Sequence, residues 1–171
     1  MSWRGLIERP GRGGPWGALI DETARAADGF LRVVETFDDA AFAAERPSDD
    51  PDCRSPRAIA EHAEYASWGY VIVIRKSSGQ PPVERPPGVM RAAGGDPRFR
   101  RPPDVRPAIR DVLILTEQSL GPLEGLTYEQ IRAMETQVRW GPRYDPEMML
   151  EHGICHFLRH RRQLERWRAG S

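Results

Sequence analysis

The chain has 171 residues, which is enough for one domain with a buried core, and we expect residues 1–171 to form a single domain. Its 39% hydrophobic and 29% charged residues, with no long apolar run, are typical of a globular protein and exclude a disordered or membrane-spanning chain. Because 25 basic residues balance 25 acidic ones, no net field attracts nucleic acid or anionic lipid, so neither is an expected partner.

The N-terminal part of the chain predicts an irregular arm followed by a first helix. Residues 1–14 are expected to form the arm and hold no apolar stretch long enough for a secretory signal, so the cytoplasm is the expected compartment. From residue 16 to about residue 37, apolar side chains recur at intervals of three and four residues, which predicts an amphipathic helix. The stretch ERPSDDPDCR, residues 45–54, then ends this pattern with prolines and acidic residues.

A second helix is predicted by the residues at its start. Ser55 is a favourable N-cap residue and the proline after it suits the first helical position, so we expect a helix over about residues 56–75. A long loop rich in proline and glycine follows over about residues 77–105. Loops of this length inside a domain are often functional lids or crossovers between helices.

The C-terminal half predicts three more helices. The first covers about residues 105–120 and is stopped by a Gly-Pro pair. Thr127 and Gln130 are typical of a capping box, which starts a shorter helix that ends near residue 138. An Asp-Pro pair then caps a last helix over about residues 146–168. No strand pair with hairpin signals is found, so we expect an all-α fold, a four-helix bundle with one long crossover loop.

The histidines gather on predicted helix faces that point inward. His152, His156 and His160 are spaced four residues apart in the last helix, so they lie within an arc of about 80° on the side that packs into the bundle. His62 shares an apolar stripe of the second helix. All four histidines of the chain are therefore predicted to face the interior, where an imidazole without a partner costs free energy.

The histidine pattern by itself leaves two interpretations open. Helical bundles build metal sites from side chains on facing helices, and neutral imidazole is a common ligand of transition metals. Buried imidazoles are also found without a metal, hydrogen-bonded to carboxylates or to the backbone. Histidines four residues apart occur by chance in many helical proteins, so the spacing does not choose between the two.

A family resemblance favours the metal site. The segment MLEHGICHFLRHRRQLERW resembles the fourth helix of the DinB/YfiT-like superfamily of metal-binding four-helix bundles. The signature of that helix is a histidine pair four residues apart followed three residues later by glutamine, and His156, His160 and Gln163 match it. The segment SPRAIAEH is similar to the capped helix that carries an earlier histidine in the family, and it matches at His62. Helix order and length extend the resemblance over most of the chain, the long loop excepted.

The resemblance implies a divalent metal ion held by His62, His156 and His160, with open positions for water or substrate. Zinc and nickel are the expected ions, since imidazole suits both. Several superfamily members act as thiol S-transferases or thiol-dependent isomerases that use a low-molecular-weight thiol. The implied function here is a metal-dependent transferase that activates such a thiol for attack on an electrophile, in a homodimer.

Other side chains are candidates for orienting the ligands or for contacting substrate. His152 does not match a ligand position of the family and is either a group behind the ligands, a substrate contact or a satisfied core histidine. The arginines are either carboxylate-binding groups or solvated charges. No catalytic residue beyond the metal-bound group is predicted. The candidates are His152, Gln163, Glu151, Glu61, Arg139, Arg143 and Arg159.

The cysteines and a run of aromatic residues have simpler interpretations. Cys53 and Cys155 are expected to be free thiols, with Cys155 a small packing residue at the margin of the histidine face. Tyr65, Trp68 and Tyr70 either line a pocket above the metal or belong to the core.

Two alternatives to an enzyme remain. The first is a module of the same fold whose metal ion is structural or sensory. The second is a metal-free interaction protein that uses the surface of the bundle, often as a dimer.

Overall fold

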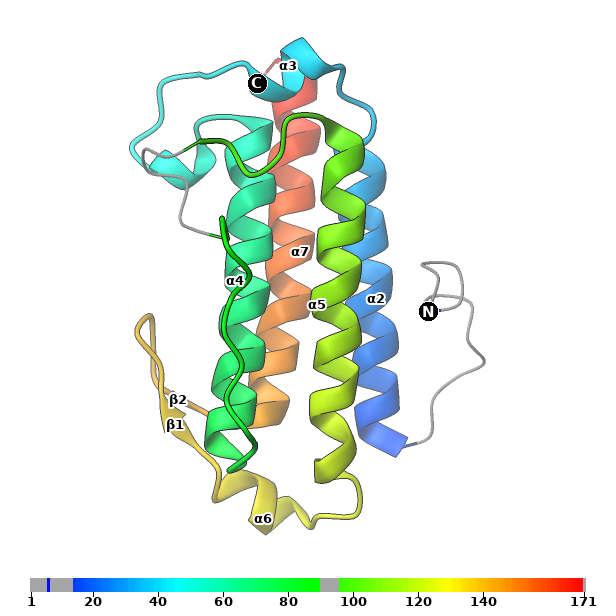
Figure 1. Cartoon of the computed structure of the whole chain (residues 1–171), viewed down its shortest axis with the longest axis vertical. Coiled ribbons are helices and arrows are strands. Elements are labelled where there is room, and N and C mark those ends of the chain that lie inside the picture. Colours follow the sequence, from blue (N-terminus) through cyan, green and yellow to red (C-terminus); the bar gives the residue numbers. More distant parts are fainter. Residues whose placement is uncertain (1–5, 7–13, 90–95, 171) are drawn as a thin grey trace.

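In the part of the chain that the structure describes, residues 6, 14–89 and 96–170, four long helices lie side by side (Figure 1). The coordinates are a computed structural model, and the expected N-terminal arm lies almost wholly outside the described residues. Helices dominate, so the predicted all-α class is confirmed. The long helices are α2 (Gly14–Val34), α4 (Pro56–Ser77), α5 (Val105–Leu120) and α7 (Pro146–Ala169).

The long helices enclose the core between them. α2 and α4 each pack against both α5 and α7, so every long helix has two such neighbours. Phe30 of α2 and Phe157 of α7 are almost completely buried, and their ring centroids lie 5.8 Å apart. Apolar burial of this kind is the main favourable contribution to folding, and it fixes the rotation of α7 that directs its histidines.

Short elements connect the long helices. α3 lies near one end of the molecule, and α6 and the two strands lie near the other (Figure 1). The strands pair antiparallel, with Thr136 opposite Tyr144 and Gln137 opposite Arg143. The short elements are α3 (Asp39–Ala43), η1 (Pro51–Cys53), η2 (Pro102–Asp104), η3 (Gly121–Leu123), α6 (Tyr128–Arg132), β1 (Thr136–Gln137) and β2 (Arg143–Tyr144).

The predicted caps start the helices where the sequence placed them. The Ser55 side chain accepts a hydrogen bond from the backbone N–H of Ala58 at the start of α4. Thr127 forms the expected capping box with Gln130. Asp145 accepts from the first turn of α7 in the same way. Each cap satisfies a backbone donor that has no partner within its helix.

The predicted helix that ends near residue 138 is wrong beyond Arg132. After α6 the chain turns and enters the hairpin of β1 and β2, so the expectation of no strand pair is also wrong. The physical reason is the burial of Val138, which is 5% exposed and belongs to the same apolar cluster as Ile131 and Leu150. Tertiary packing here outweighs the helical preference of the local sequence.

The end of the long loop is anchored to α4 by two acidic side chains. Glu61 accepts hydrogen bonds from the backbone N–H groups of Arg98 and Phe99. Glu64 is only 1% exposed and accepts two hydrogen bonds, of 3.0 and 3.1 Å, from the Arg98 guanidinium. A buried carboxylate needs such a partner. The contact therefore holds the segment that precedes α5 against α4. Residues 90–95 of the predicted loop lie outside the described residues.

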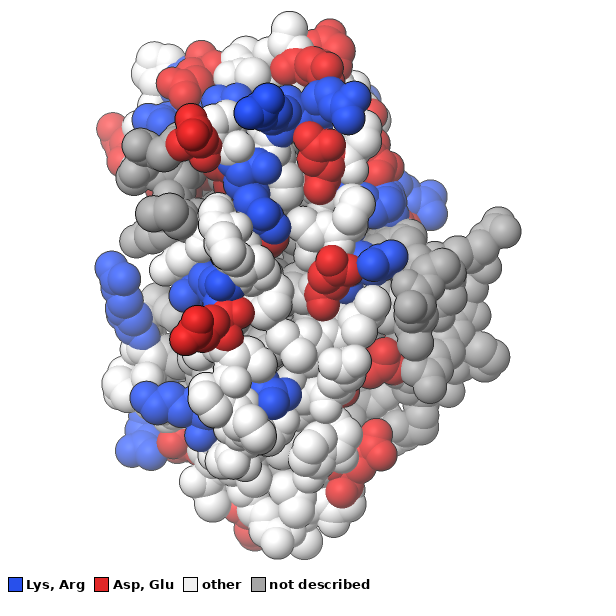
Figure 2. Space-filling view, viewed as in Figure 1, with Lys and Arg blue, Asp and Glu red and all other residues white. Residues whose placement is uncertain are grey.

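The surface carries charges of both signs. On the face drawn in Figure 2, basic and acidic side chains are interspersed with uncharged ones, and neither sign forms a broad field. Among the described helices, none combines the length and the apolar character that a bilayer span requires.

Candidate metal centre

Three histidine side chains converge between α4 and α7. His62 comes from α4, His156 and His160 come from α7, and one ligand nitrogen of each lies within 4.8 Å of the other two. The ring centroid of His62 lies 5.0 Å from that of His156 and 5.0 Å from that of His160. The centroids of the two α7 rings are 4.2 Å apart. The predicted grouping of these three imidazoles is confirmed, and together they could hold a metal ion.

Hydrogen bonding determines which nitrogen of His160 faces this group. Nδ1 of His160 lies 2.5 Å from Oε1 of Gln163, so the Nδ1–H donates and the lone pair of the neutral ring sits on Nε2. Nε2 in turn lies 3.0 Å from Nε2 of His156. Two nitrogens that each lie about 2.0–2.1 Å from one zinc ion can be this far apart. Gln163 therefore lies where a residue that orients a ligand should be.

His62 is oriented by a carboxylate that the sequence analysis did not single out. Asp52, in η1, places Oδ2 3.0 Å from Nδ1 of His62. The Asp52 side chain is 3% exposed, so its charge is held out of water and directed at the imidazole. A carboxylate that accepts from Nδ1–H leaves the Nε2 lone pair for a metal, which is the usual arrangement behind a histidine ligand.

Burial keeps the histidines of α7 neutral. It is the main cause that lowers the pKa of His156 to about 2, and the charges of His160 and His62 would add to it. Burial, followed by the charge of His62, likewise lowers the pKa of His160 to about 4. Only the neutral imidazole has a lone pair to give, so these pKa values leave both rings ready to bind a metal at neutral pH.

The metal-free protein should lose stability as the pH falls from about 6.5 to 4. Unfolding returns His160 to an ordinary pKa near 6.5, so between these pH values the unfolded chain binds a proton that the folded chain excludes. Full stability is present above pH 6.5, and His160 alone removes on the order of 3 kcal/mol by pH 4. Urea unfolding of the parent and of a His160→Gln variant across this range measures the effect. An equal pH dependence in the two proteins would contradict the assignment.

Removing the carboxylate behind His62 should weaken metal binding. We expect Asp52→Ala to lower metal affinity by about 10–100-fold, because the His62 ring loses the group that fixes its orientation and its tautomer. Competition with a chromophoric chelator at constant pH gives the affinity. The matched control is Asp49→Ala, which removes an exposed carboxylate from the same acidic stretch. If both variants bind as tightly as the parent, Asp52 does not support the site.

His152 lies beside the triad within a group of aromatic rings. Its ring centroid is 6.2 Å from that of His156. Tyr70, Trp140 and Tyr144 surround it with centroids at 5.5, 5.6 and 5.7 Å respectively. Burial first, and then the charge of Arg159, lowers the pKa of His152. His152 is therefore a neutral, half-buried neighbour of the ligand set, and it is not one of its three converging members.

Among the aromatic residues predicted to line a pocket, only Tyr70 belongs to this group. Its ring also lies 5.8 Å from that of His156. Tyr65 and Trp68 instead pack with the segment around Val83 and Val89, on another side of α4.

The charged candidates either are exposed to solvent or have other partners. Glu61 holds the long loop, as described above. Arg143 donates to the backbone carbonyl of Glu135 and pairs with its carboxylate, which braces the hairpin. Glu151 and Arg139 are exposed to solvent. Of the predicted orienting residues, Gln163 is the one placed against a ligand.

Both cysteines are free thiols, as predicted, but their surroundings differ. Cys155 is exposed, so its predicted role as a packing residue is wrong. The reason is that no described helix covers this side of α7. Cys53 is half-buried, and Gln163 donates to its Sγ over 3.7 Å. Burial, followed by the negative charge of Asp50, raises the pKa of Cys53 to about 11. This thiol stays protonated at neutral pH and is a poor nucleophile.

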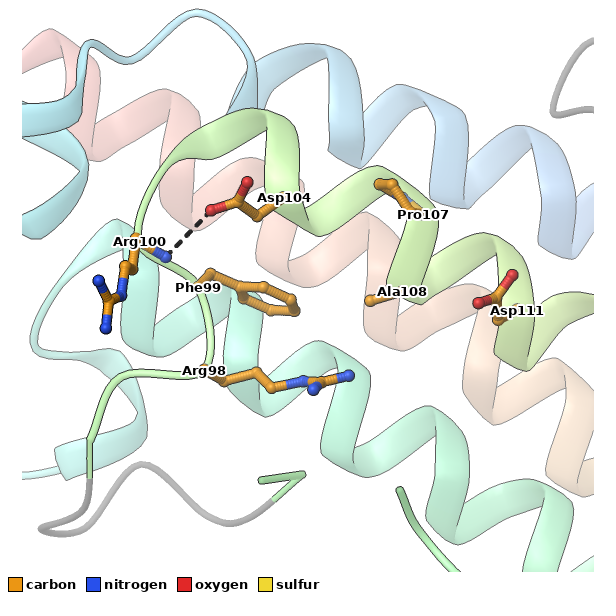
Figure 3. A pocket seen from close by; sticks show the side chains of 7 residues that line it. All are labelled: Arg98, Phe99, Arg100, Asp104, Pro107, Ala108 and Asp111. Carbon is orange, nitrogen blue, oxygen red and sulfur yellow. Dashed lines mark hydrogen bonds between the residues drawn. The ribbon is translucent and has the colours of Figure 1, made fainter. Parts of the chain in front are cut away.

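A hollow of about 400 Å³ lies between the end of the long loop and α5 (Figure 3). Several of its charged groups already have partners: Arg98 pairs with Glu64, Asp111 pairs with Arg110, and Asp104 accepts from the backbone N–H of Arg100. The hollow contains no histidine and is separate from the triad. Its lining consists of Arg98, Phe99, Arg100, Asp104, Pro107, Ala108 and Asp111.

Comparisons of the chain with protein-family models, curated proteins and solved structures found no match.

Proposed function

We propose that the four long helices form a DinB-like four-helix bundle that binds one divalent metal ion, zinc or nickel, through His62, His156 and His160. The observation that carries this proposal is that two of the three histidines each have a hydrogen-bond partner at Nδ1. Asp52 and Gln163 each occupy the Nδ1 side of a ring, which leaves Nε2 as the donor of His62 and His160. Imidazoles that are clustered only by core packing would not need to keep Nε2 available as a ligand atom on both rings.

We further propose that the bound metal serves a thiol transferase reaction. Three protein nitrogens leave coordination positions for a substrate group, as in catalytic zinc sites. When bound, the ion would lower the pKa of a low-molecular-weight thiol, and the thiolate would be the nucleophile that displaces a leaving group from an electrophile. The chain's own contribution is to keep His156 and His160 neutral through burial, and to orient the rings of His62 and His160 through Asp52 and Gln163.

The surroundings of the triad suit a small-molecule reaction. Tyr70 is 8% exposed and limits the access of water to His156 on one side. Trp140 is 49% exposed and gives the same region an apolar surface that a substrate can reach. Water exclusion on one side and access on the other are what a site for thiolate attack requires. A homodimer and a cytoplasmic location stay predictions from the sequence.

Chelation tests this function directly. We expect the purified protein to couple a low-molecular-weight thiol to a chromogenic aryl halide, to lose this turnover after dialysis against a chelator, and to regain it with zinc or nickel. Elemental analysis of the same samples gives the metal content. If about one ion per chain is bound but no thiol tested reacts faster than in buffer, the transferase proposal fails and a structural or sensory metal remains.

A further inference from the structure

A second feature of α7 lies next to the metal centre. A groove of about 320 Å³ follows the outer side of the helix. Its lining is Cys155, Leu158, Arg159, Arg162 and Arg166. We propose that this groove binds the anionic part of a small molecule that carries two carboxylates or a phosphate.

The spacing of the lining residues places them on one stripe of the helix. Cys155, Arg159, Arg162 and Arg166 follow one another at intervals of four, three and four residues. At 100° per residue they form a line that runs about 90° around α7 from the line of the histidines. The two lines therefore lie on adjoining faces of α7.

The position of Arg159 in the helix places it beside the histidines. It directly precedes His160 in α7 and follows His156 by three residues. Arg159 therefore comes from the same turn of the helix as the two predicted ligands.

Several arginines of the protein are paired with carboxylates, whereas two of the three arginines of the groove have no such pair among the described residues. Arg98, Arg106 and Arg161 each have a carboxylate partner. For Arg159 and Arg162, the described residues supply no ion pair. Guanidinium groups bind carboxylate and phosphate oxygens in paired hydrogen bonds, so two of them along one groove favour a ligand with two negative charges.

The remaining lining residues fit such a ligand. Leu158 is 43% exposed and offers apolar contact for the carbon skeleton between the charged groups. The hollow beside α5 lacks this combination, because two carboxylates, Asp104 and Asp111, line it beside its arginines, and Arg98 is paired with Glu64. We take this ligand to be the substrate or the thiol of the metal centre, and that part of the inference rests on the proposed function. Binding of a dianion by the groove does not depend on it.

The exposed Cys155 thiol reports on occupancy of the groove. We would measure the rate at which iodoacetamide alkylates Cys155, using mass spectrometry to separate it from Cys53, with succinate or inorganic phosphate added at constant ionic strength. We expect one or both anions to slow the alkylation of Cys155 several-fold and saturably. Protection by succinate alone identifies a dicarboxylate site, and protection by phosphate alone identifies a phosphate site.

Two double variants decide whether the arginines of the groove are responsible. Arg159→Gln with Arg162→Gln should abolish the protection. Arg161→Gln with Arg168→Gln removes the same charge from the same helix outside the groove and should keep it. Equal protection in both variants, or none in the parent, would overturn the proposal. So would an alkylation rate that depends on protein concentration and not on the anion, since the groove would then be an interface between copies of the chain.

A third variant separates this inference from the proposed function. Protection should persist in the His156→Ala, His160→Ala protein, because the anion is held by arginines and not by a metal. If that protein and the parent both lack metal while the anion still protects Cys155, the metal-based function fails and the anion site stands. If protection disappears with the histidines in a protein that remains folded, the anion was bound at the metal centre and the groove assignment is wrong.

Discussion

Alanine at both His156 and His160 is expected to eliminate metal binding, from about one divalent ion per chain to none. The two residues supply two of the three converging nitrogens, and a single imidazole at His62 cannot retain an ion against dialysis. Elemental analysis of the untagged parent and variant, each dialysed against metal-free buffer after loading with zinc or nickel, measures the change.

His152→Ala is the matched control for this experiment. It removes a histidine from the same helix, one turn before His156, that is not a member of the converging group. We expect the control to keep its metal. Circular dichroism of all three proteins should show that the helices persist. Equal metal content in the parent and the double variant would mean that the ion lies elsewhere in the protein.

Phe157→Ala is expected to give the largest loss of stability among single changes in α7. The Phe157 ring is 2% exposed and lies against Phe30, so its removal leaves a cavity between α2 and α7. Truncation of a buried phenylalanine typically costs about 3–5 kcal/mol. Urea unfolding followed by circular dichroism gives the change in the free energy of unfolding.

The adjacent residue provides the control. Leu158 is 43% exposed, so Leu158→Ala should change the free energy of unfolding by less than about 1 kcal/mol. Similar losses in the two variants would mean that α7 is rotated relative to the arrangement described above. That rotation would also displace His156. Comparing the free energies of unfolding of the two variants therefore tests whether α7 directs His156 toward α4.

The long helices could be predicted because their signals are local. Ser55, Thr127 and Asp145 each satisfy a backbone donor three residues away, and the side chain needed for this is visible in the sequence. The observed start of α5 at Val105 agrees with the sequence for the same reason, since the preceding prolines confine the helix to the residues after them.

The hairpin could not be predicted because its cause is distant in sequence. β1 and β2 are two residues long, too short for any alternation of polar and apolar residues. Their position follows from the burial of Val138 against a cluster that includes residues of α4 and α7. The exposure of Cys155 has a similar origin, because a residue at the margin of a helix face is covered only if a neighbouring element extends over it.

The three converging histidines could be predicted from the sequence, whereas the carboxylate behind one of them could not. His62, His156 and His160 follow from helical spacing together with the family resemblance. Asp52 precedes His62 by more than two helical turns in an irregular stretch, so its contact depends on how η1 folds back onto α4. A possible clue was its position in an acidic stretch immediately before a helix with a histidine on its inner face, yet several other carboxylates share that stretch.

The turn at η1 links the two helices that carry the histidines. Asp52 contacts His62 on α4, and its neighbour Cys53 contacts Gln163, which holds His160 on α7. The candidate site is thus closed only when segments from the first half of the chain and its last helix have come together. A partly folded chain with α7 undocked would hold two imidazoles without the third. Uptake of a spectroscopically visible ion such as cobalt by a refolding chain would therefore report the docking of α7 onto α4 and η1.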